Sequence, residues 1–222
     1  MDPPLQLIQH LRQTLSADEL GRAKRFLFER DRRRFIVGRG VLRNILSRYT
    51  KENPARLRFR YSKYGKPFLI PPAGQDTLRF NLSHSGELAL YAITCRRDIG
   101  IDVEQIRSMP DAEQLAERFF SNQENQTFRA VSPEQKDTAF FNCWTRKEAY
   151  VKAIGEGLSL PLDQFDVSLA PGEPAALLRA RGRPQEPEHW FLEGLEPAPG
   201  YVGGLVVEGS VGRLTRWQWS TT

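Results

Sequence analysis

The sequence contains little of what marks a disulfide-bonded, secreted or membrane-spanning protein. Its 222 residues include two cysteines, Cys95 and Cys143, too few and too far apart for a disulfide scaffold or a CxxC metal or redox site. No apolar run approaches the roughly 18–20 residues needed to span a bilayer. Residues 1–4 (Met-Asp-Pro-Pro) lack the basic and apolar regions of a secretory signal. We therefore expect a cytoplasmic protein without a membrane partner.

Motifs for common nucleotide and nucleic-acid functions are also missing. Gly38-Arg39-Gly40 lacks the third glycine and the preceding strand of a Rossmann fingerprint, and no Walker A sequence is present. Aromatic residues are not interleaved with basic ones as in single-strand nucleic-acid binders. His10 and His189 have no ligand-like neighbours in the sequence.

Charge of one sign is concentrated at the amino end. The chain is 40% hydrophobic and 27% charged, typical of a folded globular protein, and its formal net charge is +5. Residues 1–66 hold 17 Lys and Arg against 6 Asp and Glu, whereas the remainder holds 15 against 21. This asymmetry indicates an anionic ligand or partner, although solvated arginines on helices would give the same count.

The hydrophobic pattern predicts a mixed α and β protein. A capping box, Ser16 with Glu19, opens a helix carrying Leu20, Ala23 and Leu27. A second helix is expected from about residue 32, and a third from Ser132 to Gly155. Strands are expected at 57–61, 78–82, 88–95, 99–104, and near 163–169, 175–180, 188–193, 201–207 and 213–219, with a loop at 71–74. Two α+β subdomains, 1–100 and 101–222, are predicted.

The strand at 99–104 (Ile-Gly-Ile-Asp-Val-Glu) carries the strongest local signal. Alternation places Ile99, Ile101 and Val103 on one face. Gly100, Asp102 and Glu104 then share the other face. Two neighbouring carboxylates repel unless a cation or a basic side chain lies between them, and Mg²⁺ prefers such oxygen ligands. The alternative is a solvent-facing acidic pair on an edge strand.

Two further groups of polar residues suggest phosphate chemistry. Glu148 and Lys152 stand at i and i+4 of a helix rich in aromatic residues, where a buried charged pair needs a partner or a function. A surface ion pair is the alternative. Ser83 and His84 follow a predicted strand, where phosphate contacts suit them better than nucleophilic catalysis, because the elbow spacing is absent. A structural histidine in a turn is the alternative.

Taken in order, these segments resemble the Sfp-type 4′-phosphopantetheinyl transferase family. The matching stretches are 64–67 (YGKP), 80–85 (FNLSHS), 99–104 (IGIDVE), 144–152 (WTRKEAYVK) and 155–161 (GEGLSLP). The resemblance implies a fold of two similar α/β subdomains on a pseudo-twofold axis, with coenzyme A in the cleft between them. It implies an enzyme that transfers 4′-phosphopantetheine from coenzyme A to a serine of an apo acyl or peptidyl carrier protein, releasing 3′,5′-ADP.

The resemblance also assigns roles to individual residues. Asp102, Glu104 and Glu148 would hold Mg²⁺, and Lys152 would contact the pyrophosphate and neutralise the leaving phosphate. Glu148, or a water on the metal, would take the serine proton. The residues implied to contact coenzyme A are Arg22 at the 3′-phosphate, Lys66 at the nucleotide end, Ser83 and His84 at the phosphates, and Asp102 and Lys152.

One position departs from the family pattern. Glu19 stands where some members have a lysine, which leaves Arg25, Arg34 or Arg39 to complete the 3′-phosphate clamp. Carrier proteins of this class are small and acidic, so part of the basic charge is expected to attract them to an enzyme that acts as a monomer, without nucleic acid. The rival interpretation is a binder of nucleic acid or acidic protein that uses the basic helices at 16–60.

Overall fold

The computed structural model describes residues 4–71, 74 and 76–220, and its chain folds into two compact units. The first comprises residues up to 60, 67–77 and the segment from 215; the second comprises 61–66 and 78–214. The predicted boundary after residue 100 falls inside a strand. The predicted mixture of helices and short strands is confirmed, while the pseudo-twofold relation and the position of coenzyme A stay predictions.

The first unit is mainly helical. It holds α1 (Leu5–Arg12), α2 (Ala17–Ala23), α3 (Glu29–Thr50), η1 (Pro54–Arg56) and β2 (Pro67–Leu69), which pairs with β1 (Phe59–Tyr61). The predicted capping box is present, because Glu19 Oε2 accepts hydrogen bonds from the Ser16 N–H and Oγ, both at 3.1 Å. Leu27, predicted on the same helix, instead lies beyond its end and is 87% exposed.

The first unit has a charged centre as well as an apolar one. Glu19, 2% exposed, accepts from Arg39 Nε at 2.9 Å and from Arg43 Nε at 2.7 Å. Arg43 also donates from Nη1 to the carbonyls of Pro54 and Leu57, at 2.7 and 3.0 Å. Burial of these charges is tolerated because each is paired and hydrogen-bonded. Glu19 therefore joins α2 to α3, and Arg43 joins α3 to the chain after it.

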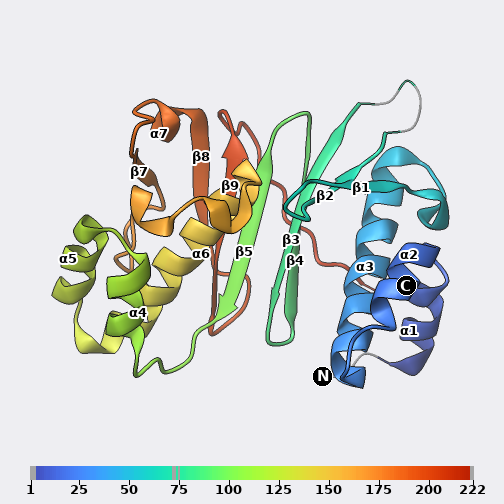
Figure 1. Ribbon diagram of the computed structural model, residues 1–222, viewed down its shortest axis with the longest axis horizontal. Coiled ribbons are helices and arrows are strands. Elements are labelled where there is room, and N and C mark those ends of the chain that lie inside the picture. Colours follow the sequence, from blue (N-terminus) through green and yellow to red (C-terminus); the bar gives the residue numbers. More distant parts are fainter. Residues whose placement is uncertain (1–3, 72–73, 75, 221–222) are drawn as a thin grey trace. The chain divides into compact units, whose positions relative to one another are not determined.

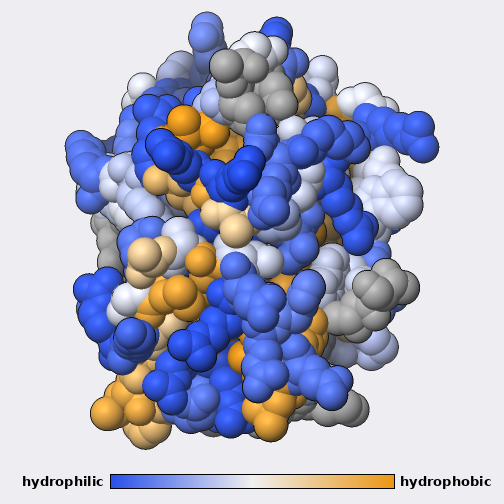
Figure 2. All heavy atoms as spheres, turned by 90° about the vertical axis from the view of Figure 1, so that its right-hand side faces the viewer, coloured by the Kyte–Doolittle hydropathy of each residue, from blue (hydrophilic) through white to orange (hydrophobic). Residues whose placement is uncertain are grey.

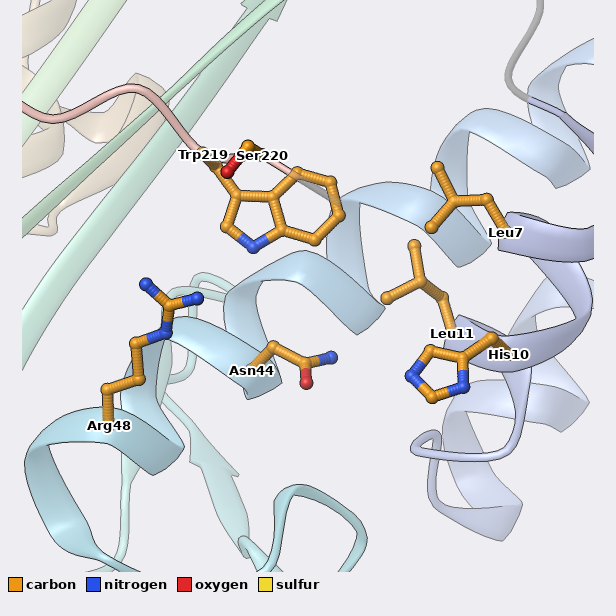
Figure 3. Close-up of a pocket in the computed structure, with 7 residues that line it drawn as sticks. All are labelled: Leu7, His10, Leu11, Asn44, Arg48, Trp219 and Ser220. Atoms are coloured by element: carbon orange, nitrogen blue, oxygen red, sulfur yellow. The ribbon is translucent and has the colours of Figure 1, made fainter. Parts of the chain in front are cut away.

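Hydrophilic side chains predominate on the side of the helices α1 to α3, with hydrophobic ones reaching the surface among them (Figure 2). The chain end from residue 215 belongs to this unit. The strand predicted at 213–219 is absent, since these residues have no partner strand. Trp219 and Ser220 instead line a pocket with Leu7, His10 and Leu11 of α1 and with Asn44 and Arg48 of α3 (Figure 3).

The second unit is built from small antiparallel sheets and the long helix α6. Its strands are β3 (Leu78–Ser85), β4 (Leu88–Cys95), β5 (Ile99–Gln105), β6 (Phe165–Val167), β7 (Leu177–Ala180), β8 (Trp190–Leu195) and β9 (Tyr201–Glu208). They pair as β3-β4, β5-β9-β8 and β6-β7. Its helices are α4 (Ala112–Phe119), α5 (Asn122–Ala130), η2 (Pro133–Gln135), α6 (Lys136–Ile154), η3 (Gly157–Ser159), η4 (Leu162–Gln164) and α7 (Glu186–His189).

Helix α6 lies along β5 and β9 (Figure 1) and ends where the sequence predicts. Gly155 has a left-handed φ of 78°, and its N–H reaches the Val151 carbonyl at 2.9 Å. The close packing depends on a small residue, because a Cβ on Gly100 would lie 2.0 Å from the Ala149 carbonyl oxygen. Gly204 of β9 has a similar role against Thr145. Aromatic residues of α6, including Phe140 and Phe141, fill the core on its other side.

Two sequence predictions fall partly on residues that the structure does not describe, namely residues 1–3 at the amino end and residues 72 and 73 of the predicted loop at 71–74. Among the described residues, no helix is long and apolar enough to cross a membrane.

Candidate active site

Strands β3 and β5 run side by side in the same direction, joined through side chains. The Ile101 N–H donates to Asn81 Oδ1 at 2.9 Å. Ser83 Oγ donates to Asp102 Oδ1 at 2.7 Å, and Ser85 Oγ donates to Glu104 Oε2 at 2.6 Å. The i, i+2 spacing of these side chains on both strands follows from strand alternation. The two serines therefore hold the two predicted carboxylates in position.

The predicted faces of β5 are confirmed. Ile99, Ile101 and Val103 are at most 5% exposed. Gly100 lies against the backbone of α6, and Asp102, two residues on, bonds Lys152 of that helix. Asp102 is therefore buried against α6, whereas Glu104 is only partly buried, so the pair does not face solvent as a whole.

Asp102 and Lys152 form the closest charged contact of the site. Lys152 Nζ lies 2.6 Å from Asp102 Oδ1 and 3.2 Å from Ser83 Oγ. Asp102 is 4% exposed, yet its second oxygen, Oδ2, is buried without a hydrogen-bond partner among the described residues. A buried carboxylate oxygen without a partner is costly in a folded protein. Asp102 thus retains one acceptor for a further ligand.

Glu148 lies one turn before Lys152 on α6 and is half-buried. Burial raises the pKa of Glu148, and the nearby charge of Asp102 raises it further, while Lys152 acts in the opposite direction. Glu104 adds a smaller upward contribution to this pKa. The carboxylates of Asp102 and Glu104 and the ammonium group of Lys152 are thus close enough to Glu148 to change its pKa. In the described part of the chain, no three metal-ligating side chains meet at metal-binding distances.

The residue next to Glu148 has a structural role. Lys147 is fully buried, and its Nζ lies 2.7 Å from Glu124 Oε2 and donates to the carbonyls of Leu162 and Phe165, at 2.7 and 2.5 Å. These contacts fix α6 to the segments behind it, and so fix the direction in which Glu148 projects. Sequence reasoning missed this contribution, because Glu124 is 23 residues earlier in the chain.

Lys66, predicted at the nucleotide end of coenzyme A, makes contacts within the second unit. Its Nζ donates to the carbonyls of Lys152 at 2.5 Å, Ala153 at 3.0 Å and Ile99 at 3.2 Å. These carbonyls belong to the end of α6 and the start of β5, where a cation is favoured at a helix carboxyl end. Burial lowers the pKa of Lys66 to about 8, against an opposing effect of Asp98.

Ser83 and His84 lie within β3, which continues to Ser85. The sequence prediction of a turn after residue 82 was therefore wrong. The turn begins only at Gly86, with a left-handed φ of 56°. Adjacent strand residues project to opposite faces, so Ser83 is buried toward Asp102 while His84 is exposed. His84 therefore lies in a strand and not in the turn that was predicted for it.

Arg22 lies in the first unit, on α2. It is exposed, and its guanidinium carbon lies 5.4 Å from the centre of the Phe35 ring. Of the arginines expected to compensate for Glu19, Arg39 is bound to Glu19 itself, whereas Arg25 and Arg34 are exposed. The departure at position 19 thus has a structural reason: Glu19 neutralises two buried arginines.

Comparisons with known proteins agree with this picture. Residues 98–206 match the 4′-phosphopantetheinyl transferase superfamily, and residues 2–96 match the family described as 4′-phosphopantetheinyl transferase, N-terminal. The chain is 44% identical to the 4′-phosphopantetheinyl transferase HetI of Nostoc sp., over 94% of this chain and 85% of that protein. It is 34% identical to the 4′-phosphopantetheinyl transferase Sfp of Bacillus subtilis, over 76% and 74%.

Among solved structures, the holo-[acyl-carrier-protein] synthase of Thermotoga maritima is similar over 51% of this chain and 64% of that one. Its TM-score is 0.39 and its sequence identity 22%.

Proposed function

Since this chain belongs to the 4′-phosphopantetheinyl transferase superfamily, we propose that the side chains around Asp102 carry out its reaction. The enzyme transfers 4′-phosphopantetheine from coenzyme A to a serine hydroxyl of an apo carrier protein and releases 3′,5′-ADP. The observation that carries the assignment is the arrangement at Asp102. This buried carboxylate binds Lys152 through one oxygen, keeps the other without a partner, and lies in the electrostatic neighbourhood of Glu148.

Magnesium is the proposed cofactor, held by Asp102, Glu104 and Glu148. The unpartnered Asp102 Oδ2 fits this assignment, since a hard cation would satisfy an oxygen that the protein leaves without a hydrogen bond. The raised pKa of Glu148 fits as well, because it results first from burial and then from the charge of Asp102, and a cation would stabilise carboxylates in such surroundings. When bound, Mg²⁺ would supply positive charge to the pyrophosphate of coenzyme A.

The chain's own groups then have distinct roles. Lys152, already held at Asp102, is placed to donate to the pyrophosphate and to stabilise charge on the leaving phosphate. Glu148 is the proposed base that takes the serine proton. The pKa of Glu148 is raised toward neutral pH, and a general base is most effective when its pKa is near the pH of the reaction. Phosphoryl-type transfer depends on such positioning and charge more than on covalent chemistry.

The remaining contacts with coenzyme A are proposed from the sequence and refined by the structure. Ser83 and His84 would contact different groups of coenzyme A, because they project from opposite faces of β3. Arg22 is proposed at the 3′-phosphate. Lys66 is proposed at the nucleotide end, with its ammonium group also fixing the end of α6.

The setting of the reaction is proposed as well. The substrate protein is an acidic acyl or peptidyl carrier protein, and the enzyme acts as a monomer in the cytoplasm. The 17 Lys and Arg against 6 Asp and Glu in residues 1–66 support an acidic partner.

The test of the function is the intact mass of apo-carrier proteins after incubation with the enzyme and coenzyme A. We expect each carrier protein that is a substrate to gain the mass of one phosphopantetheine group when Mg²⁺ is present, and no mass when a chelator removes it. A serine-to-alanine carrier is the control and should gain none. No mass gain on fatty-acid, polyketide or nonribosomal-peptide carriers, together with tight duplex binding that weakens steeply with salt, would favour the nucleic-acid binder instead.

A further inference from the structure

Three consecutive apolar side chains are exposed between α2 and α3. Phe26 is 36% exposed, Leu27 87% and Phe28 65%. Helix α2 has already ended at Ala23, and Phe28 adopts an extended conformation as the residue before α3. Isolated exposed apolar residues are common, but a run of three is a frequent sign of an interaction surface.

This run is held in place by contacts with α3. The rings of Phe26 and Phe35 have centroids 5.3 Å apart, and the guanidinium carbon of Arg22 lies over the Phe35 ring, 5.4 Å from its centroid. Aromatic pairs at this separation contribute stability beyond their buried area. The exposed side chains of Leu27 and Phe28 therefore project from an ordered base.

Positive charge surrounds the apolar run. Residues 22–34 contain seven Lys and Arg against two acidic residues. Both acidic residues are already paired, Glu29 with Arg32 and Arg33, and Asp31 with Arg30. Lys24, Arg25 and Arg34 are exposed and have no ion-pair partner within the described part of the chain. The free charge of this surface is thus positive, and it borders apolar side chains.

We propose that this surface, formed by Lys24, Arg25, Phe26, Leu27, Phe28 and Arg34 and here called the FLF surface, docks the carrier protein. The proposal rests on the proposed function, which requires a protein partner. An acidic protein that presents an apolar patch between its carboxylates matches both properties of the surface. Nucleic-acid phosphates would match the arginines but would leave Leu27 and Phe28 in water.

The experiment is a kinetic comparison of Leu27→Ser/Phe28→Ser with the wild-type enzyme. We expect KM for the apo-carrier to rise about tenfold or more, while kcat at saturating carrier and the Kd for coenzyme A stay unchanged. Arg25→Glu/Arg34→Glu should raise the same KM at low salt and lose its effect at high salt. The control is Leu178→Ser, which removes a side chain that is 52% exposed on β7 and lies in the other unit.

Direct binding separates this proposal from the function itself. Titration of labelled apo-carrier into each variant measures docking without catalysis, and a thermal melt verifies that the variants fold. Wild-type enzyme that binds the carrier but does not modify it would contradict the function and leave docking supported. An unchanged carrier Kd in the double variant would overturn the FLF surface as the docking site. Three other results would also overturn it. The double variant could lose affinity for coenzyme A, the substitutions could dissociate a dimer, or the surface could bind anionic vesicles and not the carrier.

Discussion

Lys152 Nζ lies 2.6 Å from Asp102 Oδ1, while Asp102 Oδ2, in the same carboxylate, is buried without a hydrogen-bond partner in the described chain. One oxygen is therefore fixed by the protein and the other is left for a ligand. Ser83 strengthens this division, because its hydroxyl also bonds Oδ1 and not Oδ2. The candidate site is thus oriented before any substrate arrives, which lowers the cost of organising it during the reaction.

Substitution of Gly100 tests the close contact that brings β5 to α6. Its Cβ would lie 2.0 Å from the Ala149 carbonyl oxygen and 2.4 Å from the Ala153 nitrogen, both backbone atoms. We expect Gly100→Ala to lower the free energy of unfolding by about 1–3 kcal/mol or more, measured by urea denaturation. Gly21→Ala is the control: beyond its chain neighbours and the backbone of its own helix, no atom lies within 4 Å of its Cβ, so it should stabilise α2 by roughly 0.5–1 kcal/mol. Equal effects would refute the contact.

Replacement of Glu19 by lysine should destabilise the folded protein. Glu19→Lys would place a third positive charge beside Arg39 and Arg43, and breaking a buried ion pair costs about 3–5 kcal/mol. The midpoint of chemical unfolding measures the loss. Glu117→Lys makes the same charge change in an exposed pair with Arg129 and should cost less than about 1 kcal/mol. If Glu19→Lys instead folded well and bound coenzyme A more tightly, Glu19 would not be needed for stability and position 19 would belong to the 3′-phosphate clamp.

The buried amine of Lys66 should make the free energy of unfolding rise with pH. Its pKa falls from 10.5 to about 8 on folding because the amine is buried, so the unfolded chain holds more protons between these values. Its contribution to the free energy of unfolding should therefore rise with pH from about 8 to 10.5. The comparison is Lys66→Met, in which this rise should disappear while titrations of other groups remain. Parallel stability curves for the two proteins would show that Lys66 is not perturbed.

Arg22 should distinguish coenzyme A from its 3′-dephospho form. A charge-assisted hydrogen bond contributes about 1.5–3 kcal/mol, so Arg22→Ala should weaken coenzyme A roughly tenfold to a hundredfold and spare dephospho-coenzyme A. Calorimetric titration measures both affinities. Arg30→Ala, which removes another exposed arginine of the same unit, should affect neither ligand strongly. An equal loss for both ligands in Arg22→Ala would place the clamp on other arginines.

Local patterns explain which parts of the site were predictable. Alternation in β5 correctly placed Asp102 and Glu104 on the face of Gly100. The i, i+4 spacing indicated that Glu148 and Lys152 are close enough for their charges to interact, but the ion pair that Lys152 forms is with Asp102. The role of Glu19 was not predictable, because Arg39 and Arg43 are 20 and 24 residues away in the chain. His84 was misplaced because β3 extends past Leu82, which depends on pairing with β4. The segment 213–219 has strand-like residues but no neighbouring strand.

The most direct test of the central claim is the single-turnover rate of phosphopantetheine transfer by Asp102→Ala, at saturating coenzyme A, carrier and Mg²⁺. We expect transfer to be abolished while the circular dichroism spectrum stays that of a folded protein, since Oδ1 holds Lys152 and Oδ2 would hold the metal. Glu148→Ala should behave in the same way, and Glu104→Ala more mildly, because water can replace its oxygen on the metal. A near-normal single-turnover rate of Asp102→Ala, at this Mg²⁺ concentration or at a lower one, would contradict the assignment of this site.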